Sequence, residues 1–226
     1  IPSAAEDVMV ARNVSLAELT GARLHLAHIS TAGSVRMVRE AKARGLKVTA
    51  EACPHHFTLT EELTRGYNTH AKMNPPLRTM QDVQAIKEGL RDGTIDVIAT
   101  DHAPHATQEK QQEFTEAPFG IVGLETALSL TLALVDEGVL TLESAVDKLA
   151  TAPAKAFSLN AGTLAVGAPA DVAIVDPNRE WQVDPSRFRS KSRNTPFAGW
   201  KVKGRVTTTI VSGRVVFELD RSERQA

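Results

Sequence analysis

Residues 1–160 alternate short apolar runs, typical of buried strands, with longer amphipathic segments, typical of helices. The strand candidates are 24–29, 47–52 and 95–100, and the helix candidates are 35–44, 82–90, 123–137, 142–149 and a short one opened by Pro153. Strands that alternate with helices predict an α/β fold with a parallel sheet. Polar residues gather where these strands end, which fits a β/α barrel. The pattern alone also allows an open, doubly wound sheet.

The pattern changes after about residue 160. Residues 170–177 indicate a strand followed by a turn, and segments 205–210 and 214–218 flank Ser212 and Gly213, which predicts a β-hairpin. We therefore expect two domains. Residues 1–160 form the β/α part, and residues 161–226 form a small β-rich part whose charged end, from Asp220 onward, frays.

Charge, hydropathy and cysteine content exclude several classes of protein. The 226 residues hold 26 Lys and Arg against 27 Asp and Glu, and this balance argues against a nucleic-acid binder. No apolar run approaches the roughly 18 to 20 residues that a membrane helix needs. Cys53, the only cysteine, excludes an intrachain disulfide framework and fits a reducing compartment, so we expect a cytoplasmic protein.

The densest group of reactive side chains is TDHAPH at 100–105, directly after an apolar strand. Asp101 supplies an anionic oxygen that suits a metal ion or accepts a proton from water, and the alternative is a capping aspartate among surface histidines. His28 also ends a strand and would face the mouth of a barrel, as a ligand or as an ordinary packed histidine. His25 lies three positions earlier, on the opposite face of the strand, so we expect it to be structural.

A second histidine pair follows the next strand. His55 and His56 come after Pro54, and Cys53 lies beside them. Adjacent side chains diverge, so we expect at most one of the two imidazoles to face a common centre. A single cysteine with no second one nearby points only weakly to a metal site, and we expect Cys53 to serve packing.

Two loops carry groups that suit a small molecule. Pro75 and Pro76 stiffen the loop KMNPPLR at 72–78, which either presents the Asn74 amide to a ligand or only connects two elements. The backbone of APFG at 117–120 either contacts a ligand or only leads into the following helix. Glycine-rich nucleotide-binding motifs and the Gly-x-Ser-x-Gly elbow are absent from the sequence, which argues against nucleotide cofactors and serine-hydrolase chemistry.

Taken in order, these motifs closely resemble those of bacterial class I dihydroorotases, the long type within the metal-dependent amidohydrolases. The strings are AHIST at 27–31, EACPHHF at 51–57, KMNPPLR at 72–78, ATDHAPH at 99–105, PFG at 118–120 and NTPFAG at 194–199. The resemblance implies that residues 1–160 are the C-terminal part of a (β/α)8 TIM-type barrel. Residues 161–226 would be part of the small β-rich domain that follows it.

The resemblance also implies roles for particular residues. His28 matches a ligand of one zinc ion, and Asp101 matches a ligand of the other that also shuttles a proton. Asn74, His105, Phe119 and Gly120 match positions that contact the substrate. His55 and His56 belong to a family motif without matching its metal ligands. The implied reaction is the reversible, zinc-dependent interconversion of N-carbamoyl-L-aspartate and dihydroorotate in pyrimidine synthesis.

Several family motifs are missing from the sequence. A His-x-His-x-Arg string, a bridging acidic ligand and a His-Cys-Glu-Asp-like string would lie before Ile1, so we expect the chain to be a C-terminal fragment. Two of the zinc ligands remain, whereas a zinc ion usually takes at least three from protein. We therefore expect weak zinc binding and no dihydroorotase activity from these 226 residues alone.

Other interpretations stay open at this point. One is an allantoinase or hydantoinase, which hydrolyses a related cyclic amide. A second is a non-catalytic dihydroorotase homologue that acts as a scaffold for aspartate transcarbamoylase, and a homo-oligomer is a further mode of assembly. A third is an unrelated, metal-independent β/α binding domain.

Overall fold

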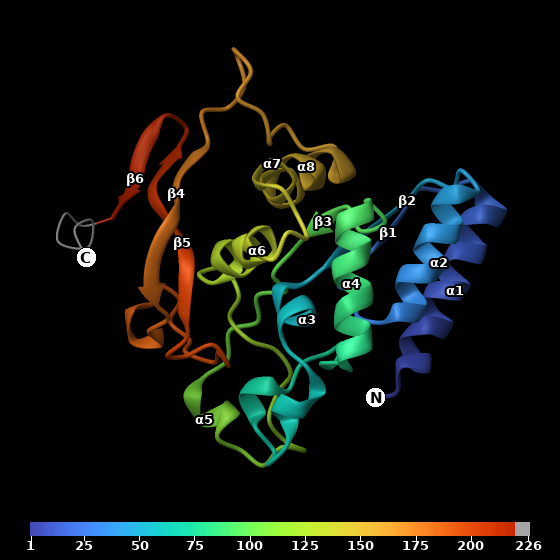
Figure 1. Cartoon of the computed structure of the whole chain (residues 1–226), viewed down its shortest axis with the longest axis horizontal. Helices are drawn as coiled ribbons and strands as arrows, with labels where there is room; N and C mark the ends of the chain where they lie inside the picture. Colours follow the sequence, from blue (N-terminus) through green and yellow to red (C-terminus); the bar gives the residue numbers. More distant parts are fainter. Residues whose placement is uncertain (220–226) are drawn as a thin grey trace.

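The computed structural model describes residues 1–219 and contains two separate three-stranded sheets (Figure 1). The first consists of β1 (Leu24–Leu26), β2 (Val48–Ala52) and β3 (Val97–Ile98), in that order. Both strand pairs are parallel. The parallel α/β arrangement is therefore confirmed. Within residues 1–219 this sheet ends at β1 and β3 and does not close into a barrel.

Helices surround the parallel sheet, and short helical turns lie in the loops. The α-helices are α1 (Ser3–Thr20), α2 (Ala32–Ala43), α3 (Pro54–Thr58), α4 (Met80–Asp92), α5 (Thr107–Lys110), α6 (Ala127–Asp136), α7 (Leu142–Val146) and α8 (Ala152–Phe157). The remaining turns are η1 (Glu61–Thr64), η2 (Thr69–Ala71), η3 (Asp147–Thr151) and η4 (Pro185–Arg187). Helix α2 packs between α1 and α4, and α4 also contacts α3.

Local capping explains where the two amphipathic helices begin. The Thr31 hydroxyl accepts a hydrogen bond from the Ser34 N–H and starts α2, three residues before the expected start. Thr79 and Asp82 form a reciprocal capping box at the start of α4. Gly45, just past α2, has φ +79°, as expected for a glycine that ends a helix.

Two elements differ from the sequence-based expectations. Helix α1 was not predicted, because apolar residues occur all around it: Val10 and Val14 are buried, whereas Leu16 and Leu19 are exposed. The expected helix over 142–149 is α7 followed by the π-helical turn η3. Pro153 lies in the first turn of α8, as predicted.

The second sheet is antiparallel and lies beside α6. Its strands are β4 (Val172–Gln182), β5 (Lys201–Val211) and β6 (Arg214–Glu218). The predicted hairpin around Ser212 and Gly213 is confirmed, and both residues have positive φ, as a tight hairpin turn requires. Where a turn was expected at Pro177, β4 continues through a register shift against β5. Residues 220–226, expected to fray, lie outside the described residues.

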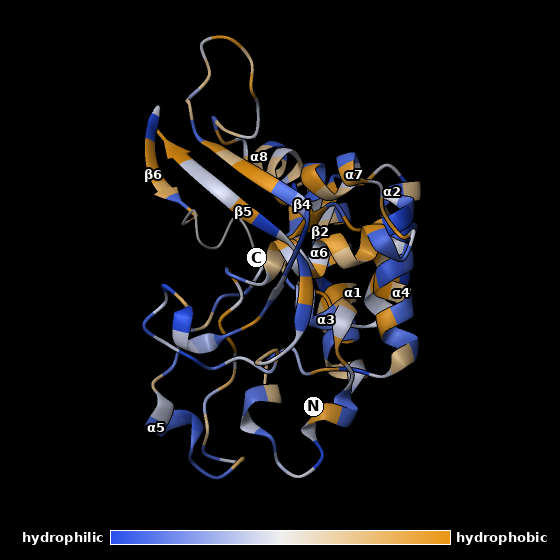
Figure 2. Ribbon diagram, turned by 60° about the vertical axis from the view of Figure 1, so that its left-hand side comes forward, coloured by the Kyte–Doolittle hydropathy of each residue, from blue (hydrophilic) through white to orange (hydrophobic). Residues whose placement is uncertain are grey.

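The contact between α6 and β5 joins the two sheets into one core. The Trp181 indole N–H donates to the Ser129 hydroxyl at 3.1 Å and to the Gly204 carbonyl at 3.0 Å. Figure 2 shows that α6 is mainly hydrophobic, whereas α5 and the loops near it are mainly hydrophilic. The polar loops therefore gather on one side of the packed helices. None of the helices among residues 1–219 is both long and apolar enough to cross a membrane.

Candidate active site

His28 and Asp101 lie just beyond β1 and β3, the strands on either side of β2. Both adopt positive φ, +38° and +48°, which is uncommon for residues other than glycine and recurs at functional sites. The His28 side chain is half-buried and Asp101 is exposed. Among residues 1–219, neither the His28 imidazole nor the Asp101 carboxylate has a hydrogen-bond partner. Both groups are thus free to bind a ligand.

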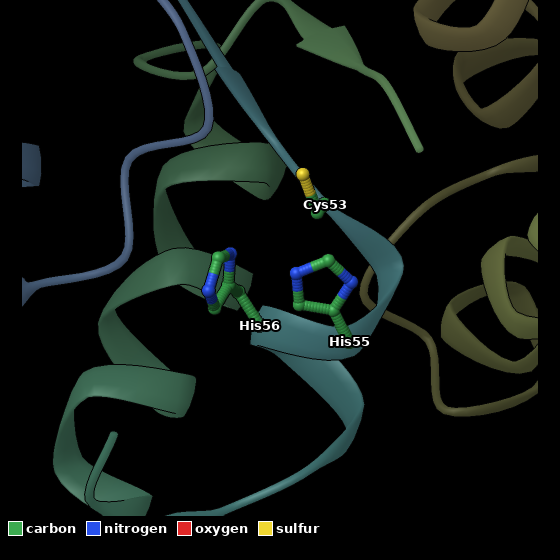
Figure 3. Close-up of side chains that lie close together, drawn as sticks. All are labelled: Cys53, His55 and His56. Atoms are coloured by element: carbon green, nitrogen blue, oxygen red, sulfur yellow. The ribbon is translucent and has the colours of Figure 1, made fainter. Parts of the chain in front are cut away.

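Between these two positions, the end of β2 leads into α3 and carries three buried side chains. Cys53, His55 and His56 each offer one ligand atom within 4.8 Å of the other two (Figure 3). The two imidazole centroids lie 4.2 Å apart. The prediction that at most one histidine would face a common centre is therefore wrong. Both lie on a helical turn, where successive side chains are rotated by only about 100°.

Burial controls the protonation of the two adjacent histidines. It lowers the pKa of His55 well below the ordinary value, and the charges of His56 and His28 act in the same direction. It also lowers the pKa of His56 to about 4, although the hydrogen bond to the Pro75 carbonyl opposes this shift. Both imidazoles are consequently neutral at pH 7.

The Cys53 thiol lies close enough to Asp101 for the carboxylate charge to act on it. Burial raises the pKa of Cys53 far above its ordinary value, and the charges of Asp101 and Glu51 raise it further. His28 acts electrostatically on both His55 and His56. The fold therefore brings both candidate zinc ligands within electrostatic range of one buried Cys and His cluster.

His25 has the structural role that its position predicts. Its Nδ1 lies 2.8 Å from the Thr49 hydroxyl and its Nε2 lies 3.0 Å from Glu51 Oε2. Its ring packs against Phe157. Glu51 also accepts a hydrogen bond from the His28 backbone N–H at 3.3 Å. A carboxylate on β2 therefore holds the backbone that carries His28.

A second group of predicted site residues lies where the loop before α4 meets the loops after β3. His105 Nε2 donates to the Phe119 carbonyl at 2.8 Å, and the Gly120 N–H donates to the Lys72 carbonyl at 2.9 Å. The Lys72 ammonium lies 4.7 Å from the centre of the Phe119 ring. Asn74, two residues beyond Lys72, has an exposed side chain. All four residues assigned to substrate contact therefore lie in linked loops.

Most of the backbone hydrogen-bonding groups of Phe119 and Gly120 are already paired within the protein. The Phe119 carbonyl accepts from His105, and the Gly120 carbonyl accepts from the Lys110 ammonium at 3.1 Å. The Gly120 N–H is used as well. In the part of the chain that the structure describes, the Phe119 N–H is the unpaired donor of these two residues. A ligand at this position thus meets one free N–H.

Gly120 is required where this loop passes the Asp101 segment. Its φ is +106°, and a Cβ at this position would lie 2.4 Å from the Ala103 Cβ. Distances below about 3 Å are not sterically allowed, so any larger residue would push the two loops apart. This close approach places the Phe119 loop directly against the segment between Asp101 and His105.

Sequence reasoning missed Asn194, the buried residue that ties these loops together. Its side-chain amide donates to the Ala103 carbonyl at 2.8 Å and to the Gly120 carbonyl at 3.2 Å. Its side-chain oxygen accepts from the His105 backbone N–H at 3.2 Å. Asn194 opens the NTPFAG string, and no periodicity or spacing in the sequence links it to residues about 90 positions away.

Besides His25, two further histidines lie outside both groups. His102 accepts a hydrogen bond from the Gly123 N–H at its Nδ1, which makes it part of the loop scaffold. His70 lies in the turn η2, and burial, reinforced by the charge of Lys110, lowers its pKa.

Comparison with known proteins gives the family of the chain. The family model described as "Amidohydrolase family" matches residues 8–216. The dihydroorotase of Syntrophotalea carbinolica is 61% identical over 219 residues, which are 97% of this chain and 52% of that protein. The dihydroorotase of Syntrophus aciditrophicus is 56% identical over 220 residues, with the same coverage. The chain spans about half the length of the curated relatives it matches.

Solved structures agree with this assignment. A dihydropyrimidinase from Brevibacillus agri NCHU1002 matches with a TM-score of 0.90 at 27% identity, over 96% of this chain and 49% of that chain. The L-hydantoinase of Arthrobacter aurescens gives the same TM-score at 33% identity, with the same coverage. The α/β architecture therefore corresponds to about half of these enzymes, and the chain belongs to the amidohydrolase family.

Proposed function

We propose that the full-length protein carrying these residues is a zinc-dependent dihydroorotase of the cytoplasm. Identity of 61% with a dihydroorotase over nearly the whole chain carries the proposal. In this proposal β1, β2 and β3 are strands of a (β/α)8 barrel formed by residues 1–160. Residues 161–226 then belong to the small β-rich domain.

The donor groups suit the metal that the proposal requires. The His28 imidazole and the Asp101 carboxylate are zinc-type ligands, and neither has another hydrogen-bond partner within residues 1–219. Further ligands would come from the remainder of the full-length protein. Zinc, when bound, polarises an amide carbonyl and makes water easier to deprotonate. His28 and Asp101 would hold the two ions of the pair.

Asp101 would transfer the proton in this reaction. In the hydrolytic direction, water adds to the ring amide carbonyl carbon of dihydroorotate, and the Asp101 carboxylate accepts the proton that water loses. The carbon–nitrogen bond then breaks, and Asp101 returns the proton to the departing nitrogen, which yields N-carbamoyl-L-aspartate. A positioned acid–base group of this kind contributes about 10²- to 10⁴-fold to a rate.

The linked loops would orient the substrate. Asn74 offers an exposed amide, and the Phe119 N–H is an unpaired donor. His105 is held by its hydrogen bond to the Phe119 carbonyl, and Gly120 allows the loop to approach the Asp101 segment. These groups supply hydrogen bonds to the carboxylate and amide oxygens of the substrate, which fixes the reacting carbonyl near Asp101.

The test is turnover of dihydroorotate by the full-length protein with and without Asp101→Asn. We expect the substitution to lower kcat by about 10³-fold, because the carboxylate that moves the proton is lost. Asp147→Asn, a matched change of an exposed carboxylate outside the site, should leave kcat unchanged. Equal activity of Asp101→Asn and the unmodified protein would refute the assigned role.

The structural matches favour a second candidate, a hydantoinase or dihydropyrimidinase, since solved structures of both kinds of enzyme superpose on this chain with a TM-score of 0.90. Comparing kcat/KM for dihydroorotate, hydantoin, dihydrouracil and allantoin separates these activities. Preference for any of the last three would replace the dihydroorotase proposal. No turnover, together with a stable complex with aspartate transcarbamoylase, would favour a scaffold.

A further inference from the structure

The buried cluster of Cys53, His55 and His56 contains polar atoms that the described protein does not satisfy. His55 Nε2 and His56 Nδ1 are buried and have no hydrogen-bond partner within residues 1–219. Each unpaired buried group of this kind costs about 1–3 kcal/mol, so such groups are rare and call for an explanation. Two of them in adjacent side chains, beside a buried thiol, point to a ligand that pairs with all three.

The hydrogen bond of His56 determines which of its two ring nitrogens can bind a metal ion. Its Nε2 lies 3.0 Å from the Pro75 carbonyl oxygen, which can only accept, so Nε2 carries the proton. Nδ1 of the neutral ring therefore has a free lone pair. A metal-binding imidazole characteristically donates its other ring N–H to a backbone carbonyl or a carboxylate in this way. His56 is thus already oriented and protonated as a ligand.

The other two side chains complete a suitable donor set. Burial keeps His55 neutral, which leaves one of its ring nitrogens able to coordinate, and a bound cation displaces the thiol proton of a coordinating cysteine. One sulfur and two imidazole nitrogens are ligands for zinc and similar divalent transition metals, in preference to magnesium or calcium.

We propose that Cys53, His55 and His56 bind a zinc-class divalent cation, at a site separate from the one assigned to His28 and Asp101. The three ligand atoms lie within 4.8 Å of one another, and ligands of a tetrahedral zinc ion lie about 3.5 Å apart. Binding would require these atoms to approach one another by up to about 1.3 Å. A buried cation here would link the residue after β2 to the first turn of α3 (Figure 3).

The proposal does not depend on dihydroorotase activity and is tested by metal binding alone. The probe is Co²⁺ added to the metal-free 226-residue chain, followed by the thiolate-to-cobalt charge-transfer absorption. Cys53 is the only cysteine of the chain, so this band reports on Cys53 alone. We expect the band to saturate at one equivalent of Co²⁺ and to be absent in Cys53→Ser.

Histidine variants and a metal-site control make the test specific. His56→Gln should weaken the binding that produces the band by at least about tenfold, whereas His70→Gln should not. His70 is a matched control because its Nδ1 is also buried and unpaired but lies outside the cluster. A chain that carries both His28→Asn and Asp101→Asn should keep the band, since the proposed site is separate.

X-ray absorption of the zinc-loaded, unsubstituted chain tests the same ligands without relying on variants that fold poorly. One sulfur at about 2.3 Å from zinc and two imidazoles would support the site. No sulfur neighbour, no thiolate band, or a band unaffected by His56→Gln would each overturn the proposal.

Discussion

Glu6 carries a largely buried charge whose removal should lower the stability of the protein. Its Oε1 accepts hydrogen bonds from the backbone N–H groups of Ser30 and Thr31, at 2.8 and 3.2 Å, and from the Ser34 hydroxyl at 2.7 Å. Its Oε2 accepts from the Ser30 hydroxyl and pairs with Arg78 at 3.4 Å. The carboxylate thus joins α1 to the N-terminus of α2, where the helix dipole favours a negative charge.

The expected cost of Glu6→Gln follows from these contacts. The side chains of Arg78 and Glu6 are only 6% and 12% exposed, and breaking a buried pair on one side costs about 3–5 kcal/mol. Arg78 retains its hydrogen bonds to the Ile1 carbonyl and the Ser30 hydroxyl, so we expect a loss near 3 kcal/mol. Glu18→Gln is the matched control, because the Glu18–Arg44 pair is about half exposed and should contribute no more than about 0.5 kcal/mol.

The pH dependence has a defined sign. Burial by itself raises the pKa of Glu6, but the hydrogen bonds from Ser30 and Ser34 and the charge of Arg78 outweigh it, so the pKa is lowered. A carboxyl with a lowered folded pKa stabilises the protein fully above the ordinary glutamate pKa, and this stabilisation is lost as the pH falls through the lowered value. The difference between the unmodified chain and Glu6→Gln should shrink over that range.

Urea unfolding followed by far-UV circular dichroism, at pH 7 and at acidic pH, measures both effects. The helical signal follows unfolding of the whole chain, including α1 and α2, the elements that Glu6 joins. Equal losses for Glu6→Gln and Glu18→Gln at pH 7 would refute the reasoning. A Glu6→Gln effect that stays constant to the lowest pH would show that the charge of Glu6 is not its cause.

Three further predictions concern the loops and the metal. Gly120→Ala should cost about 1–3 kcal/mol more than Gly45→Ala in urea unfolding, because both glycines have positive φ but only at Gly120 would a Cβ collide with a neighbour. Asn194→Ala should cost about 2–4 kcal/mol in the same assay and lower kcat/KM of the full-length protein, since three hydrogen bonds between loops are lost. A chelator should abolish turnover by the full-length protein, and zinc should restore it; activity that resists chelation would contradict a metal-dependent reaction.

Much of the fold was predictable because its signals are local. The three parallel strands are short apolar runs, and Thr31 and Thr79 cap the two amphipathic helices. The hairpin at Ser212 and Gly213 follows from turn chemistry. Helix α1 escaped prediction because it has apolar residues on all sides, and only its contact with α2 determines which of them are buried.

The residues of the candidate site also fall into two sets, those that the sequence identified and those that only the structure brought together. Sequence motifs and strand-end positions identified His28 and Asp101, and the fold places both beside one cluster at adjacent strand ends. His55 and His56 converge because they lie in a helical turn and not in a strand. Their being neighbours in the sequence does not distinguish these two cases. By itself the sequence determined the α/β class, the family motifs and the reactive residue types, because periodicity and motif order are properties of neighbouring residues. Only the tertiary structure decided that Asn194 holds the His105 and Gly120 loops together, because contacts across some 90 residues depend on how the whole backbone packs.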